Sequence, residues 1–291
     1  MCIRDSYYTD GGKAERSELN KNDLFPSLNM KYQMNEKNSL RFAFSRTVTR
    51  PSFIEMAPFL YQESYGSAQI RGNADLQNGY NYNIDLRYEL FEKNGDMLSI
   101  TAYYKHLKAP IERVQTLSGG SAVHSFRNAD NGMATGVEIE FRKEIVKDLR
   151  FGVNGSYMYT NVKLPEGGAY TNSQRALQGA SPYLANADLT YSPAFSNDRQ
   201  LSVALLYNLQ GPRIHSVGIS GLGDIKQQPV HTLNFTGSYR FNRRFAVKLQ
   251  VNDLLNQDIL FKQEVPTTGD KVEVERFRKG TGFEVGFSYD L

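Results

Sequence analysis

Hydrophobic and polar residues alternate along most of the chain, in runs too regular for a helix. From about residue 28 onward, apolar side chains recur at every second position, which places them on one face of a β-strand. In the run 80–90, one phase holds Tyr80, Tyr82, Ile84, Leu86, Tyr88 and Leu90, and the other holds Asn81, Asn83, Asp85, Arg87 and Glu89. The pattern predicts an all-β protein with strands near 28–34, 39–48, 79–91, 96–106, 131–144, 149–162, 181–192, 199–210, 230–241, 244–255 and 279–291.

The connections between these strands alternate between short and long. The short ones are 35–38, 92–96, 146–148, 194–198 and 242–243, and they are rich in turn-forming residues. The long ones run near 49–78, 107–130, 163–180, 211–229 and 256–278. Barrels of the bacterial outer membrane have short periplasmic turns and long outer loops, whereas a soluble sandwich has no reason to sort its loops in this way.

Strand length and charge placement also favour a membrane barrel. Strands of soluble proteins average about five or six residues, whereas a tilted strand needs about nine to eleven to cross a bilayer, and several runs here alternate for longer. Basic side chains on a lipid face cost roughly 2–4 kcal/mol near mid-bilayer. The apolar phases carry no charge, and the polar phases carry the charges that suit a wet lumen. We therefore predict an antiparallel transmembrane β-barrel.

Composition excludes several other classes of protein. The chain has 291 residues, 40% of them hydrophobic, with 34 basic and 31 acidic side chains interspersed, so it offers no basic stripe for nucleic acid. Its single Cys2 cannot form an internal disulfide. The longest apolar run, 203–207, is far shorter than the roughly 18 residues of a membrane-spanning helix. A helical membrane protein is excluded.

The start of the chain and the strand count both suggest missing upstream sequence. Residues 1–6 are interpreted as non-native, and no export signal follows them. We expect residues 1–22 to be a non-native or poorly ordered segment and 23–291 to be a partial barrel domain. Eleven antiparallel strands cannot close with an antiparallel seam, and bacterial single-chain barrels have even strand numbers. The chain is therefore expected to be incomplete at its N-terminus.

Several stretches resemble the C-terminal barrel region of TonB-dependent outer-membrane receptors. They are SRTVTRPSF (45–53), GNADLQNGYNYNIDLRYELF (72–91), NADNGMATGVEIEF (128–141), QGASPYLANADLTY (178–191), VNDLLNQDI (251–259) and GTGFEVGFSYDL (280–291). The resemblance implies that the eleven strands are the C-terminal half of a 22-stranded barrel whose plug domain is absent here. It also implies a place in the outer membrane of a Gram-negative bacterium, with the C-terminus periplasmic.

The same resemblance implies a function and a set of partners. The receptors take up large, scarce ligands such as iron chelates, vitamins, oligosaccharides or peptides, driven by the TonB complex through the N-terminal region that is missing here. Their partners also include outer-membrane lipid and the barrel-assembly machinery, which reads the C-terminal strand. Leu291 departs from the Phe that commonly ends this signal. A passive porin-like barrel and a soluble all-β binding module stay open as alternatives.

No motif points to catalysis. The four histidines are scattered without metal-ligand spacing, and we expect neither a metal site, nor a cofactor, nor an enzyme. Glu138 and Glu140 share one face of a strand, and we interpret them as lumen lining, with Arg142 in the same row, rather than as an acid–base pair. By analogy with the receptors, the candidate ligand contacts are the outer-loop residues Phe53, Tyr61, Tyr65, Arg71, His124, Arg127, Tyr170, Arg175, Arg213 and His215. Packing within the loops is the alternative for each of them.

Overall fold

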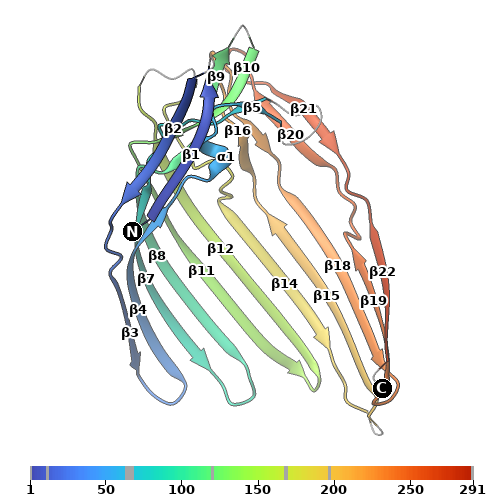
Figure 1. Ribbon diagram of the computed structural model, residues 1–291. Coiled ribbons are helices and arrows are strands. Elements are labelled where there is room, and N and C mark those ends of the chain that lie inside the picture. The colour runs from blue at the N-terminus through green and yellow to red at the C-terminus, as the bar shows by residue number, and fades with distance from the viewer. Residues whose placement is uncertain are drawn as a thin grey trace.

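One antiparallel sheet of eleven long strands forms the wall of the molecule (Figure 1). The computed structural model describes residues 2–10, 13–62, 69–118, 121–166, 170–195 and 198–289. The wall strands are β3 (Ser27–Gln33), β4 (Asn38–Thr49), β7 (Gly79–Phe91), β8 (Met97–Lys108), β11 (Asn131–Val146), β12 (Leu149–Lys163), β14 (Tyr183–Tyr191), β15 (Gln200–Gln210), β18 (Val230–Arg240), β19 (Phe245–Asn252) and β22 (Gly282–Tyr289). The all-β class and the eleven predicted strands are confirmed.

Each wall strand pairs with the wall strands before and after it in the chain. The order runs without a crossover from β3 to β22, and all of these pairings are antiparallel. Within the described chain, β3 and β22 are the two edges of the wall and do not pair with each other. Figure 1 shows them on opposite sides of the sheet. Leu291, the terminal residue that departs from the usual Phe of the assembly signal, lies outside the described residues.

The short connections lie at one end of the wall and the long ones at the other (Figure 1). Tight turns form because residues that tolerate positive φ stand at the required positions. Gly95 has φ 88° in the turn between β7 and β8, and Asp148 has φ 66° between β11 and β12. The predicted sorting of loops by length therefore corresponds to two physically different ends, which we call the turn end and the loop end.

The two faces of the wall are the reverse of those of a soluble sheet. The apolar phase is exposed, as shown by Leu86 at 47% and Ile139 at 48% of their full exposure. On the other face, Glu89 and Ser99 are buried at 5% and 2%. Exposed apolar area on this scale needs a nonpolar solvent, since monomeric soluble proteins rarely show contiguous apolar patches of more than a few hundred Å².

Ion pairs link side chains of β4, β7 and β11 across the inner, polar face, and the link from β7 to β11 passes over β8. Glu89 accepts from Arg41 Nε at 2.7 Å and from Arg87 Nε at 2.9 Å. Arg87 Nη2 lies 3.8 Å from Glu140, which also pairs with Arg142 Nη2 at 2.9 Å. The chain of alternating charges crosses β4, β7 and β11. Glu140 is thus placed as lumen lining, with Arg142 as its partner.

Amide side chains continue this polar face across the next strands. Asn186 donates to Asn154 Oδ1 at 2.7 Å, and Asn208 donates to Asn186 Oδ1, so one ladder of three amides crosses β12, β14 and β15. Each of these residues is opposite the next in the strand register. The inner face therefore satisfies its polar groups within the wall, as buried polar groups require.

Shorter elements that the sequence analysis did not predict lie within the long connections and before the wall. They are β1 (Cys2–Asp10), β2 (Lys13–Lys21), α1 (Phe53–Met56), β5 (Leu60–Tyr61), β6 (Ile70–Arg71), β9 (Ile111–Ser118), β10 (Ser121–Asn128), β13 (Gln174–Arg175), β16 (Arg213–Ser216), β17 (Ile225–Gln227), β20 (Ile259–Glu264) and β21 (Lys271–Phe277). β1 and β2 form a hairpin of their own within 1–22. Across the described ranges, no helix has the length and apolarity to cross a membrane.

A pair of neighbouring substitutions tests which face of the wall meets lipid. Ile139→Lys places a charge on the exposed apolar face, so we expect it to destabilise the membrane-inserted state by roughly 2–4 kcal/mol. Glu138→Lys, one residue away on the inner face, is the matched control and should cost less than about 1 kcal/mol. The measurement is urea-dependent folding into phosphatidylcholine vesicles, followed by gel mobility. Equal effects of the two substitutions would contradict the assignment of faces.

Candidate ligand-binding site

Two small sheets cover the loop end of the wall (Figure 1). The first has the order β5-β6-β10-β9, and the second has the order β16-β17-β20-β21. The apolar cluster of Val114, Ala129, Val162 and Leu164 anchors β9 against the upper end of β12, with Tyr170 packed beside it. This packing makes the long connections an ordered layer, which we call the loop layer.

A buried ion pair joins two parts of the loop layer. Arg175 Nη1 lies 2.9 Å from Glu112 Oε2, and their side chains are only 3% and 6% exposed. Arg175 Nη1 also donates to the carbonyl of Ala176 at 3.1 Å, and the backbone N–H of Gln178 points to Glu112 at 3.5 Å. Burial raises the pKa of Glu112, while the guanidinium of Arg175 opposes this rise. The pair therefore ties β9 to the segment that contains β13.

Polar side chains also join the two small sheets to each other. His124 accepts at Nδ1 from Arg113 Nε at 3.0 Å, and the residue is 8% exposed. Gln115 lies 3.4 Å from His124 Nε2 and donates to Ser216 Oγ in the second small sheet. Gln178 Nε2 donates to the carbonyl of His215 at 2.6 Å. These contacts give the loop layer a fixed arrangement of its own.

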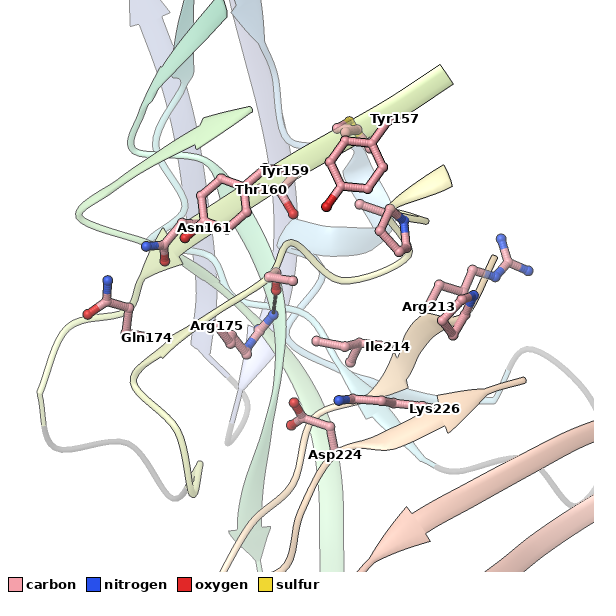
Figure 2. A pocket seen from close by; sticks show the side chains of 15 residues that line it. Tyr157, Tyr159, Thr160, Asn161, Gln174, Arg175, Arg213, Ile214, Asp224 and Lys226 are labelled. Atoms are coloured by element: carbon pink, nitrogen blue, oxygen red, sulfur yellow. Dashed lines mark hydrogen bonds between the residues drawn. The ribbon is translucent and has the colours of Figure 1, made fainter. Parts of the chain in front are cut away.

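A cavity of about 570 Å³ opens where β12 extends beyond its neighbour (Figure 2). β14 begins opposite Tyr157, so on that side residues 158–163 of β12 pair only with β13, at Val162 and Lys163, while β11 pairs with them on the other side. The gap exposes the rings of Tyr157 and Tyr159, and Arg213 and Lys226 approach it from β16 and β17. Its volume is in the range of small-molecule sites.

A second cavity, of about 580 Å³, continues from the first along the second small sheet. The two share Pro212, Asp224 and Lys226, so we describe them together as the basic groove. Among the described residues, its cations outside any ion pair are Arg213, Lys226, Lys262 and Lys271, and its carboxylates are Asp224 and Glu264. Lys262 lies opposite Glu273 of β21, with which it interacts electrostatically. Arg175 also lines it but is neutralised by Glu112. The groove has an excess of positive charge.

A third cavity, of about 570 Å³, lies on the inner face beneath the loop layer. Its lining includes hydroxyl and amide side chains of β4 and β7, among them Thr47, Asn81 and Asn83, together with the charged Asp85 and Lys105. Asn81 Nδ2 donates to Thr49 Oγ1 at 3.0 Å. Glu112 and Leu177 close the cavity from above. A polar space thus lies directly below the layer that carries the basic groove.

The structure brings two of the ten sequence-predicted contacts, Arg175 and Arg213, into one cavity. Arg213 Nε donates to Gln227 Oε1 at 2.7 Å. Tyr170 lies nearby, bridged to Ile219, and its buried hydroxyl has no hydrogen-bond partner among the described residues.

The remaining predicted contacts are dispersed over the loop layer. Phe53 begins α1 and is 58% exposed, and Arg71 donates to the carbonyl of Pro58. The ring centroids of Tyr61 and Phe59 are 6.2 Å apart, and those of His215 and Phe261 are 4.7 Å apart. His124 is buried as described above, and Arg127 is half-buried on β10. Tyr65 lies outside the described residues.

Lys262 and Lys271 were not predicted as contacts, because no contact was proposed from the fifth long connection, and Lys226 was not chosen from the fourth. Lys262 and Lys271 stand on β20 and β21, which form a hairpin. Alternating residues on both sides of a Pro-Thr-Thr-Gly-Asp segment, 266–270, are a hairpin signal that would have predicted it. Within the described chain, no group of three or more His, Cys, Asp or Glu side chains is arranged to hold a metal ion.

Comparison with known proteins agrees with this architecture. Residues 5–289 match the family described as "Outer membrane protein beta-barrel family". The ferric enterobactin receptor of Pseudomonas aeruginosa is 21% identical over 270 residues, which are 86% of this chain and 35% of that protein. The chain thus spans about a third of the curated relative.

Solved structures show the same fold. A ferric enterobactin receptor of P. aeruginosa superposes with a TM-score of 0.61 at 19% identity, over 95% of this chain and 40% of its own. The ferric yersiniabactin uptake receptor of Yersinia pestis gives 0.64 at 13% identity, over 96% and 39%. These matches confirm the likeness to the C-terminal part of an outer-membrane receptor barrel.

Removing one partner of the buried ion pair should have a pH-dependent effect. Arg175→Gln leaves Glu112 buried without a counter-charge, which we expect to destabilise the loop layer by about 3 kcal/mol at pH 8. Because burial raises the pKa of Glu112, the carboxyl becomes neutral as pH falls, and the loss should shrink toward pH 5. The loss of stability is measured as the decrease in the hydrogen-exchange protection factors of residues 111–115 at each pH.

The double variant Glu112→Gln/Arg175→Gln is the control for this prediction. It removes both charges, so its protection factors should not change between pH 8 and pH 5 beyond those of the unmodified protein. A loss in Arg175→Gln that is the same at both pH values would show that an unpaired carboxylate is not its cause.

Proposed function

The chain belongs to the outer membrane protein beta-barrel family, and we propose that it forms the C-terminal part of the barrel of a TonB-dependent receptor. In this proposal the protein is an active transporter for a large ligand and not an enzyme. The ligand class that we favour is an anionic iron chelate of the siderophore type, ahead of vitamins, oligosaccharides or peptides. The observation that carries this choice is the basic groove in the loop layer.

The groove offers the chemistry that a ferric siderophore needs. Arg213 and Lys226 supply cations for an anionic chelate, and Tyr157 and Tyr159 supply ring faces beside them. Charge-assisted hydrogen bonds from such cations are stronger than neutral ones. The relatives named above are receptors for ferric enterobactin and ferric yersiniabactin, which supports the same class. The ligand would enter through the loop layer and pass the polar cavity beneath it.

The proposal includes an orientation and partners. We place the short turns and the C-terminus in the periplasm and the loop layer outside the cell, as in other outer-membrane barrels. The TonB complex would act through a plug and N-terminal region upstream in the intact receptor, and the barrel-assembly machinery would engage β22 (Gly282–Tyr289). The lipid of the outer membrane would surround the exposed apolar face.

A passive porin-like barrel is the main competing function. A porin would have the same wall but no energy-coupled plug. Conductance of the intact protein in planar bilayers therefore distinguishes a porin from a plugged receptor. The intact protein should show no large, steady pore if it is a plugged receptor. A wide, permanently open channel would favour the porin.

Substitutions in the basic groove should weaken ligand binding by the intact receptor. Arg213→Gln and Lys226→Gln should each raise the Kd for ferric enterobactin, the first probe, about five-fold, which corresponds to roughly 1 kcal/mol. Growth of a receptor-deletion strain on this chelate as sole iron source should fall in parallel. Arg244→Gln, an exposed cation at the turn end, is the control and should change neither.

The same binding and uptake measurements distinguish an anionic iron chelate from the other ligand classes. If both groove variants bind and take up ferric enterobactin like the unmodified receptor, the groove is not its site. Uptake of a neutral oligosaccharide or of cobalamin by the unmodified receptor, with no uptake of anionic chelates, would overturn the siderophore class.

A further inference from the structure

One short segment separates the basic groove from the third cavity, which we call the inner cavity. Residues 175–179, which we call the strap, run from β12 to β16: Arg175 pairs with the end of β12, and the N–H of Gly179 donates to a carbonyl of β16 at 3.0 Å. Ala176 lines the groove, whereas the next residue, Leu177, lines the inner cavity. Among the residues that the structure describes, none lines both spaces. The strap is therefore a partition between the groove and the lumen.

A single carboxylate oxygen holds the strap at both of its ends. Glu112 Oε2 lies 2.9 Å from Arg175 Nη1 and faces the backbone N–H of Gln178 at 3.5 Å. The other hydrogen bonds of the strap involve neutral groups, such as the N–H of Leu177, which donates to Thr160 Oγ1 at 3.2 Å. The ion pair is the contact whose loss leaves a buried charge without a partner. Glu112 therefore closes the partition.

Arg175 keeps hydrogen-bond donors that no described residue uses. Its Nη1 serves Glu112 and the carbonyl of Ala176, whereas its buried Nε and Nη2 have no hydrogen-bond partner among the described residues. The residue lines the groove together with Arg213 and Lys226 (Figure 2). Because unmet buried donors lower stability, an anionic group that supplies acceptors to them is bound favourably. Arg175 thus has one anion already and the capacity to bind a second.

The inner cavity can accommodate the carboxylate of Glu112 once Arg175 has left it. Glu112 lines this cavity, whose walls include the amides of Asn81 and Asn83. Of the two other charged side chains that line it, Lys105 has the opposite charge to Glu112, and Asp85 has the same charge. Lys105 forms no ion pair with any described residue. A freed Glu112 therefore meets a polar space with a compensating cation.

We propose that an anionic ligand in the basic groove opens the strap by taking Arg175 away from Glu112. The inference rests on the proposed function, which supplies the anionic iron chelate. Oxyanions of the chelate accept from Arg175, Glu112 turns to the inner cavity, and the strap no longer separates the two spaces. The ligand shifts this equilibrium because it gains Arg175 fully only in the open arrangement. A neutral ligand has no charge to exchange, so the same contact selects for anionic ligands.

The first experiment tests the partition without a ligand, in the intact receptor with Cys2→Ser as the background. Ala176→Cys places a thiol on the groove side of the strap, and Leu177→Cys places one on the side of the inner cavity. A membrane-impermeant maleimide added to whole cells should label Leu177→Cys at least ten-fold more slowly than Ala176→Cys. Adding Glu112→Gln should raise the labelling rate of Leu177→Cys at least five-fold and leave that of Ala176→Cys unchanged. Heat-modifiable gel mobility verifies that each variant is folded.

The second experiment tests the exchange of partners with ferric enterobactin as the probe. Glu112→Leu/Arg175→Met replaces the ion pair by packed apolar side chains, which keep the strap closed without a charge to exchange. Its Kd for the chelate should rise less than five-fold, whereas the maximal rate of uptake should fall at least ten-fold. In the unmodified receptor, saturation with the chelate should increase hydrogen exchange at residues 175–179, although simple burial under a ligand would decrease it.

Asp198→Leu/Arg243→Met is the matched control, because it replaces an exposed ion pair at the turn end in the same way. It should change neither the Kd nor the rate of uptake. Equal labelling of the two thiols, or a labelling rate of Leu177→Cys that Glu112→Gln does not alter, would overturn the partition. Unchanged uptake in Glu112→Leu/Arg175→Met, or decreased exchange at the strap on saturation, would overturn the exchange of partners.

These outcomes are distinguishable from a failure of the proposed function. If the receptor binds and takes up ferric enterobactin but the double variant of the buried pair transports it normally, only the inference about the strap fails. If the receptor binds no anionic chelate, the proposed function fails and the exchange fails with it, while the labelling rates still show whether Glu112 closes the partition.

Discussion

The hydrogen-bonding need of backbone groups in hydrocarbon governs the rest of this structure. An unpaired backbone N–H or C=O costs several kcal/mol in lipid, so a chain that crosses by strands must pair each strand on both sides. Within the described chain, the wall meets this requirement for every strand except its two edges, β3 and β22, by long strands in strict antiparallel order. The inverted faces follow from it, because the side chains of such a wall alternate between lipid and lumen. Polar Glu89 is buried and apolar Ile139 is exposed for this reason.

Ion pairs and hydrogen bonds keep the polar side chains ordered on the inner face and in the loop layer. Glu89 and Glu140 link arginines of three strands, and the three asparagines of the amide ladder link the next three. In the loop layer, the buried ion pair of Glu112 and Arg175 links two segments in the same way. These contacts hold the basic groove in place, so binding chemistry at the surface depends on pairs buried behind it.

The wall could be predicted from the sequence, whereas the loop layer could not. A period of two repeated over ten or more residues determines a strand and its outward face, as in 79–91, because few other structures sort residues in this way. The loop layer depends on contacts between segments far apart in the chain. Arg175 meets Glu112 across 63 positions of sequence, and no local pattern records that meeting. Even so, Gly119 and Gly120 between two alternating runs are a hairpin signal for β9 and β10 that was available and not used.

The uninterrupted neighbour order of the wall also governs how it can form. Every wall strand finds its partners in the segments next to it in the chain, across a tight turn or one of the long connections. No distant strand must arrive before a hairpin can close, so the sheet can grow by adding one strand at a time to an existing edge. As in repeat proteins, its cohesion is then approximately a sum of nearest-neighbour interfaces. Weakening one turn should delay the addition of the strands beyond it while leaving the hairpins already formed intact.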